Sequence, residues 1–270
     1  MAYKNFQTEM WSKYIETELG KNCVLLEDCN TMYEGEIKHA AKVKIQGVAR
    51  PTLQDYTGAS LGDPESVEDS SVYLDIEKAK AFNFIIDDIE RAQTEARVME
   101  TLTEEATKAL AEARDTYIAS KATEAGKLSD SLKIATAAEA KAAIDKAFVW
   151  LWSNGVKINS GVSIVLPPWF YSLFKDNLSA LFTDNVDMLR RGVIGMYNGA
   201  EVKLSDNLYN DGTDDYVMVR TKKAIAFAGQ LKEVEAYRPH DLFADAVKGL
   251  DVYGAKVIRP KELYVVKAHE

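Results

Sequence analysis

The sequence contains few of the residues that usually carry catalysis, metal binding or cross-linking. Of its 270 residues only two are cysteines and three are histidines. Two cysteines are too few for a disulfide framework or for a zinc site by themselves, so Cys23 and Cys29 are expected to be small buried thiols in a reducing compartment. None of the histidines lies at metal-ligand spacing from another. These shortages argue against a disulfide-rich secreted domain and against a histidine or cysteine metal centre.

Long apolar runs and an excess of basic residues are also missing. The first twenty residues lack the apolar core of a signal peptide, and no run approaches the ~20 apolar residues that a membrane span requires. Lys and Arg number 33 against 42 Asp and Glu, which gives a formal net charge of -9. An acidic balance disfavours a surface that neutralises phosphates. We therefore expect a protein that is made in the cytosol and does not bind nucleic acid through a basic face.

Three stretches in the first half of the chain carry clear periodicity. Residues 5–20 place large apolar side chains at helical spacing and end at Gly20. Residues 43–48, VKIQGV, alternate like a strand, and so do residues 72–77. The stretch between the two strands is rich in Gly, Pro, Ser and Asp. This pattern predicts an N-terminal amphipathic helix followed by a long hairpin with an extended tip.

A long helix is expected directly after the hairpin. Asp87 and Glu90 have the spacing of a capping box, and apolar residues, mostly alanine, then recur at helical spacing as far as Tyr117. Gly126 is a suitable stop. About 36 helical residues at 1.5 Å each would extend roughly 54 Å, which is longer than a small domain.

The second half of the chain mixes both kinds of element. Residues 136–153 predict a helix with an apolar C-terminal end, and VSIVLPPWFYSLF predicts a buried strand, a proline stop and a short helix. Strand-like runs follow at 200–204, 216–228, 232–237, 247–258 and 262–267. The expected fold class is therefore α+β.

The best candidate for a ligand site is an acidic loop between two of these strands. Clustered oxygens suit calcium, but the spacing misses the EF-hand pattern, and plain hairpin loops use the same residue types. No phosphate loop, nucleophile elbow or kinase motif is present. We expect no catalytic residue and no cofactor, and keep the loop only as the alternative of a metal-dependent enzyme, with the candidate ligands Asp206, Asn210, Asp211, Asp214 and Asp215.

The predicted hairpin needs a surface to lie on. A two-stranded ribbon alone is marginal in water, and its open edges invite aggregation. The N-terminal aromatic helix raises the same problem. Neighbouring copies of the chain would solve both, so contacts between subunits are predicted at Phe6, Trp11, Tyr14, Val43, Ile45, Tyr56, Val72, Leu74 and Ile76.

The order of the segments resembles one viral family. MWSKYIETELGKNCVLLEDCNTMYEGEIKHAAKVKIQGV is similar to the N-terminal arm and first extended-loop strand of tailed-bacteriophage major capsid proteins of the Hong Kong 97 type. VYLDIEKAKAFNFIIDDIERAQ is similar to their return strand and spine helix. RRGVIGMYNGAEVKLSDNL resembles the axial segment, and AIAFAGQLKEVEAYRP with FADAVKGLDVYGAKVIRPKEL resembles the closing strands. The likeness covers nearly the whole chain and rests on the order of the segments.

The resemblance implies a fold and a function. It implies an N-terminal arm (1–41), an extended loop (42–83), a spine helix of the peripheral domain (84–127), an axial domain (128–231), peripheral strands (232–256) and a C-terminal strand (257–270). It implies hexamers and pentamers of an icosahedral shell around double-stranded DNA, a virion location and assembly in the bacterial cytoplasm. Scaffolding and portal proteins would be partners; because the chain starts at the arm, the scaffold is expected to be a separate protein. An encapsulin-like compartment is the alternative with the same fold.

Overall fold

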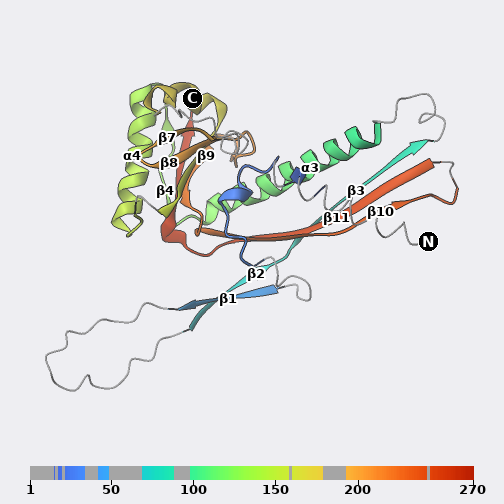
Figure 1. Cartoon of the computed structure of the whole chain (residues 1–270). Coiled ribbons are helices and arrows are strands. Elements are labelled where there is room, and N and C mark those ends of the chain that lie inside the picture. Colours follow the sequence, from blue (N-terminus) through green and yellow to red (C-terminus); the bar gives the residue numbers. More distant parts are fainter. Residues whose placement is uncertain are drawn as a thin grey trace, which may run out of the picture.

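The computed structural model describes residues 15, 18–19, 22–33, 42–48, 69–87, 98–157, 160–178, 193–241 and 244–270. Its elements form a larger lobe, an elongated lobe and a projecting two-stranded ribbon (Figure 1). Helices and sheets are mixed, which confirms the α+β class. None of the described helices is both long enough and apolar enough to cross a membrane.

The larger lobe is built on a mixed sheet. In the described residues its strand order is β4-β12-β9-β6-β8-β7, and β5 also pairs with β12. Helices α4 (Ala137–Ser153) and α5 (Pro168–Phe174) pack on this sheet through one large apolar cluster. The strands are β4 (Lys127–Leu128), β5 (Leu132–Lys133), β6 (Val162–Leu166), β7 (Val193–Tyr197), β8 (Ala200–Leu204), β9 (Asp215–Thr221) and β12 (Leu263–His269).

Helix α4 follows the sequence pattern closely, as predicted. The Thr136 hydroxyl accepts a hydrogen bond from the Glu139 amide, and the Glu139 carboxylate accepts one from the Thr136 amide. This reciprocal pair satisfies two amides that a helix start otherwise leaves unpaired. Phe148 and Leu151 on the inner face are buried in the core between helix and sheet.

The elongated lobe is a three-stranded antiparallel sheet beneath a helix. Its order is β10 (Ile225–Tyr237), β11 (Ala244–Val257) and β3 (Lys78–Asp87), and α3 (Val98–Ser120) lies along it (Figure 1). Alternate residues of β3 point toward the helix side, where Phe82 and Phe84 stack at 5.9 Å between ring centroids.

The predicted helix start at residue 84 is wrong. Strand β3 continues to Asp87, with Phe84 opposite Val247 and Asp87 opposite Ala244 on β11. Two aromatic residues and adjacent isoleucines suit a half-buried strand. The capping box predicted at Asp87 and Glu90 is not tested, because Glu90 lies outside the described residues. Residues 88–97 lie outside the described part. At its other end α3 stops at Ser120, and a short 3-10 turn (Lys121–Glu124) leads to β4.

Two further boundaries differ from the sequence expectation. The run 216–228 is not one strand: a turn at Thr221–Ala224 divides it between β9 in the larger lobe and β10 in the elongated lobe. The domain boundary expected between residues 231 and 232 falls inside β10. One long strand therefore crosses what the sequence suggested was a division.

The ribbon consists of β1 (Lys42–Val48) and β2 (Asp69–Asp75), paired antiparallel as predicted. Its base crosses β11 so closely that a Cβ atom added at Gly254 would overlap the carbonyl oxygen of Asp75. Glycine at this position is therefore what allows the two backbones to touch.

Candidate functional site

The inner face of the ribbon is covered by the chain itself. Val43, Ile45 and Leu74 are buried and pack with Ala226 and Ala228 of β10. These three were expected to contact another subunit, and for this part of the ribbon the expectation is corrected: their apolar surface is already satisfied within one chain. Alternation in a sequence shows that a face must be buried, but it does not show whose surface buries it.

The other residues predicted at subunit contacts fall into two groups. Val72 and Ile76 are half-buried, and Tyr73 between them is 52% exposed. An exposed tyrosine on a strand of a projecting ribbon is a suitable contact for a partner surface, because Tyr is enriched in the centres of protein interfaces. The remaining predicted contacts lie outside the described residues: Phe6, Trp11, Tyr14 and Tyr56.

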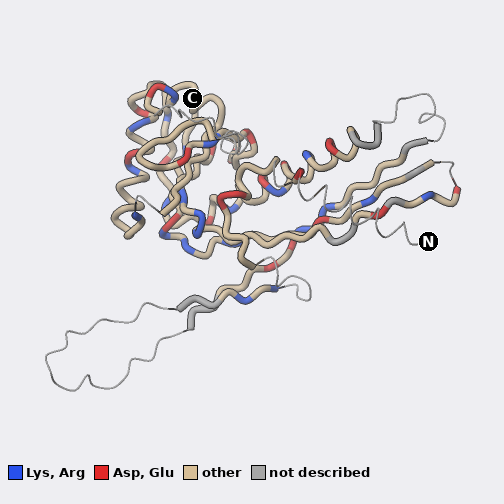
Figure 2. Tube along the Cα trace, viewed as in Figure 1, with Lys and Arg blue, Asp and Glu red and all other residues tan. Residues whose placement is uncertain are grey.

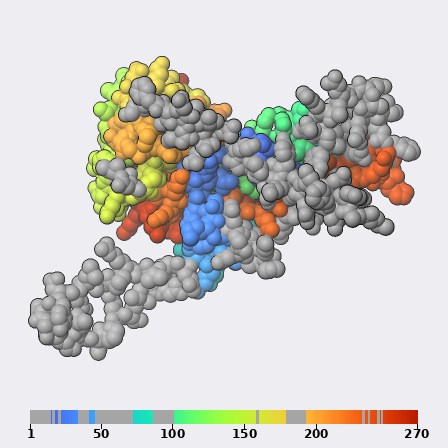
Figure 3. Space-filling view, viewed as in Figure 1, coloured from blue at the N-terminus to red at the C-terminus, as the bar shows by residue number. Residues whose placement is uncertain are grey.

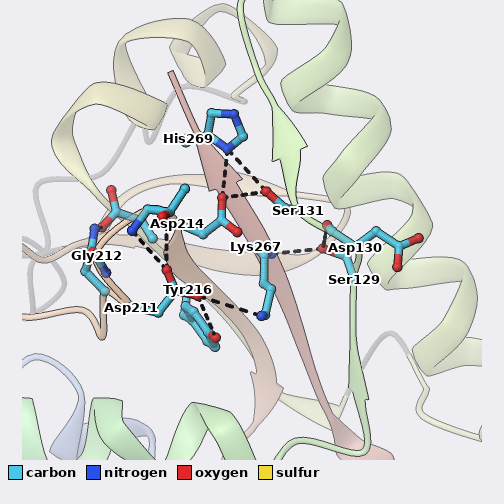
Figure 4. Close-up of polar contacts among 12 residues, drawn as sticks. Ser129, Asp130, Ser131, Asp211, Gly212, Asp214, Tyr216, Lys267 and His269 are labelled. Carbon is cyan, nitrogen blue, oxygen red and sulfur yellow. Dashed lines mark hydrogen bonds and ion pairs between the residues drawn. The ribbon is translucent and has the colours of Figure 1, made fainter.

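The acidic loop between β8 and β9 is organised by its own hydrogen bonds (Figure 4). Asp211 Oδ1 accepts hydrogen bonds from the amides of Asp214 and Thr213 at 2.8 and 3.0 Å. These two bonds, together with one from the Tyr216 hydroxyl, hold the pKa of Asp211 below its usual value. Asn210 accepts from the amide of Gly212, which has a positive φ of 96°. The loop therefore has the geometry of a tight hairpin turn.

The other carboxylates of this loop point to separate protein partners. Asp214 is buried and accepts from Ser131 Oγ at 2.8 Å, and His269 Nδ1 lies 2.7 Å from the same oxygen (Figure 4). Asp215 accepts from Trp169 Nε1 at 2.6 Å and from Asn210 Nδ2 at 2.7 Å.

The structure does not bring the five candidate ligands together around one point. Among the described residues no group of three or more His, Cys, Asp or Glu side chains is placed to hold a metal ion. Asp206 is exposed. The carboxylates of Asp211, Asp214 and Asp215 have structural partners instead, and these contacts join the loop to the β4–β5 connection, β12 and α5.

The most notable polar residues were not predicted from the sequence. Arg114 on α3 makes a bidentate pair with Asp251 on β11, with Nε–Oδ2 and Nη2–Oδ1 distances of 2.7 and 2.5 Å, and both side chains are buried. Lys203 and Arg220, in the larger lobe, are also fully buried. In the sequence, Asp251, Lys203 and Arg220 are charged residues within strand-like runs. Such residues are too common for the pattern to show which of them are buried and paired.

Comparisons with known proteins identify the family. A family model described as phage capsid protein matches residues 69–266. A solved structure from Mycobacterium phage Che8 is similar, with 29% identity, a TM-score of 0.71 and 90% of each chain covered. No curated protein matches.

More distant structures share the fold. The capsid of cyanophage P-SCSP1u has 15% identity and a TM-score of 0.68, covering 90% of this chain and 86% of its own. A virus-like particle from Pyrococcus furiosus has 10% identity and a TM-score of 0.60, covering 96% and 99%. These likenesses agree with the Hong Kong 97-type fold predicted from the segment order. The fold alone does not favour a phage shell over an encapsulin-like compartment, but the family match does. The chain belongs to the phage capsid protein family, as a major capsid protein with a structural role.

Proposed function

We propose that copies of this chain assemble into the hexamers and pentamers of an icosahedral shell, and that the ribbon of each subunit lies over a neighbour. The observation that carries the proposal is the shape of the ribbon. Its base is anchored on β10, while β1 and β2 project away from both lobes (Figure 1). Lys42, Lys44 and Tyr73 are exposed on it.

A projecting ribbon has a physical need for a partner. Packing on β10 covers the inner face of the ribbon, but β1 and β2 pair only with each other among the described strands. Strand edges that pair with nothing are aggregation sites. A surface supplied by a second subunit would cover these edges and the exposed Tyr73. Obligate interfaces of this kind usually bury more than about 2,000 Å² in total.

We further propose that the shell encloses double-stranded DNA without reading its sequence, and that it is assembled in the bacterial cytoplasm with a scaffolding and a portal protein. The net charge of -9 supports a wall that does not adhere to its contents. Basic and acidic positions are interspersed along the described chain (Figure 2). Neither catalysis nor a cofactor is part of the proposal.

Deletion of residues 52–69, which lie between the two ribbon strands except for Asp69, the first residue of β2, tests the proposal. The expected product is a folded subunit with an unchanged far-UV circular dichroism spectrum that forms few large shells in sedimentation velocity. A matched control replaces the same residues with a Gly/Ser segment of equal length, which separates side-chain contacts from connection length. Full-size shells in normal yield from both variants would contradict the proposal.

A further inference from the structure

The segment 22–30, which we call the strap, joins the two lobes without belonging to either sheet. It contains one short 3-10 turn (Leu26–Asp28), and its one described backbone bridge is from Asn30 to Ala226 of β10. In the space-filling view the N-terminal surface, in blue, runs across the middle of the molecule between the lobes (Figure 3). Leu25, Asp28 and Cys29 of the strap are buried, so the strap is inserted into the joint between the lobes and does not belong to one lobe alone.

The elongated lobe holds the strap through one carboxylate. Asp115 on α3 accepts hydrogen bonds from three consecutive strap amides, those of Val24, Leu25 and Leu26, at 2.8, 3.2 and 3.3 Å. Asp115 itself is 1% exposed. A buried carboxylate requires such donors, so seating the strap satisfies Asp115 as well as the three amides.

The larger lobe holds the same strap through two buried cations. Lys203 Nζ on β8 lies 3.0 Å from Asp28 Oδ1 and 3.2 Å from Glu27 Oε2. Arg220 on β9 donates to two strap carbonyl oxygens, that of Asp28 at 2.5 Å and that of Leu25 at 2.7 Å. Each lobe thus contributes charge to one nine-residue segment.

Both charged and apolar contacts hold the strap in its site, and the charged contacts lower the free-energy cost of separating the strap from that site. Leu25 and Cys29 lie in a core cluster that α3, the sheet of the larger lobe and strands β10 and β11 form together. A seat made only of apolar residues would expose its whole area to water when emptied. Buried ion pairs add little net stability over apolar packing, because water solvates their charges when they separate. A segment held in this way has one specific position and can still be released as a unit.

We propose that the strap is a releasable clamp, whose seating on Asp115, Lys203 and Arg220 fixes the orientation of the larger lobe relative to α3. This inference concerns motion within one subunit and goes beyond shell assembly. Release of the strap removes these three contacts and leaves the direct packing of α3 on the larger lobe as the remaining restraint, so the range of orientations widens. Reseating the strap restores a single orientation.

Native-state hydrogen exchange of the unmodified chain is the first test. In rising urea below the unfolding transition, the amides of residues 24–26 and 30 should exchange through one shared opening. That opening should precede exchange in β6 and β9. Exchange of the strap only with global unfolding, or of each amide independently, would overturn the proposal.

A variant tests the link to lobe orientation. Lys203→Met leaves Asp28 buried without its cation, so strap peptides should exchange at least tenfold faster while α4 peptides stay unchanged. Lys223→Met, at an exposed lysine, is the matched control. Spin labels at Ala109→Cys on α3 and Ala142→Cys on α4, both exposed positions, report the inter-lobe distance, because the native cysteines are buried.

The distance distribution should be narrow in the parent and in Lys223→Met, and broader in Lys203→Met. Faster exchange of the strap amides with an unchanged distance distribution would show that the strap does not fix the lobe orientation, and it would overturn the proposal. Uniformly faster exchange across the chain would indicate general destabilisation and would also overturn the proposal. If Lys203→Met does not fold, the urea experiment on the unmodified chain decides alone.

Discussion

The buried pair of Arg114 and Asp251 should be strongly coupled, and a double-mutant cycle measures this. Arg114→Met keeps most of the side-chain length but leaves Asp251, which is 0% exposed, without its cation. Removing one partner of a buried pair costs about 3–5 kcal/mol. The guanidinium also lies 5.6 Å from the Phe227 ring centroid and 6.0 Å from that of Tyr253. The lost cation–π contact adds about 1 kcal/mol.

The second single variant and the double variant complete the cycle. Asp251→Leu leaves a buried guanidinium and should cost a similar amount. Arg114→Met with Asp251→Leu replaces both charges by apolar groups, so no buried charge remains unpaired. We expect the double variant to be no less stable than the better single variant. The coupling energy is then at least as large as the cost of the more damaging single substitution, about 3–5 kcal/mol.

Urea unfolding followed by far-UV circular dichroism is a suitable assay, because α3 carries Arg114 and its loss changes the helical signal. Lys108→Met, at an exposed position on the same helix, is the control and should change the free energy of unfolding by less than about 0.5 kcal/mol. Additive single effects, with a coupling energy near zero, would refute the argument that these charges depend on each other.

Three further predictions follow from the structure. Burial raises the pKa of Asp115 from 3.8 to about 6, so the folded chain binds a proton that the unfolded chain does not between about pH 4 and 6. The contribution of this group to stability should fall by about 3 kcal/mol as pH rises through that window. Urea midpoints of the parent and of Asp115→Asn at pH 4.5 and 7 measure the difference. Stability that changes with pH equally in both proteins would contradict the prediction. Phe84→Asp should lower the free energy of unfolding by about 3 kcal/mol, because it places a charge in the cluster between β3 and α3; a urea midpoint like that of the parent would count against this packing. Calcium titrated by calorimetry should give no binding heat with the parent or with Asp211→Ala and Asp214→Ala, and heat that is lost in these variants would restore the metal-site alternative.

The local elements were predictable where sequence pattern and packing agree. The hairpin strands, helix α4 and the strand–proline–helix unit of β6 and α5 appear close to where alternation, the helical spacing of apolar residues and Pro167 predicted them. Each has a short-range signal that no long-range contact opposes.

The sequence predictions failed where the structure depends on contacts between residues far apart in the chain. At Phe84 the chain pairs with β11, where the resemblance implied that the spine helix begins. At Val43 the covering surface comes from β10, more than 180 residues away in the chain. The buried charges Asp115, Lys203 and Arg220 could not be identified for the same reason, since each depends on a partner distant in sequence. The sequence shows which residues are charged, but only the folded chain shows which of these charges are buried together.

Because the ribbon crosses β11 closely at Gly254, a small rotation at this crossing would move the far end of the ribbon by several ångströms. Seven residues of β1 at about 3.3 Å each extend roughly 23 Å beyond the crossing. A rotation of ten degrees there would displace the far end of the strand by about 4 Å, roughly one strand spacing. Any side chain in place of this hydrogen would push the two backbones apart and change the direction in which the ribbon projects.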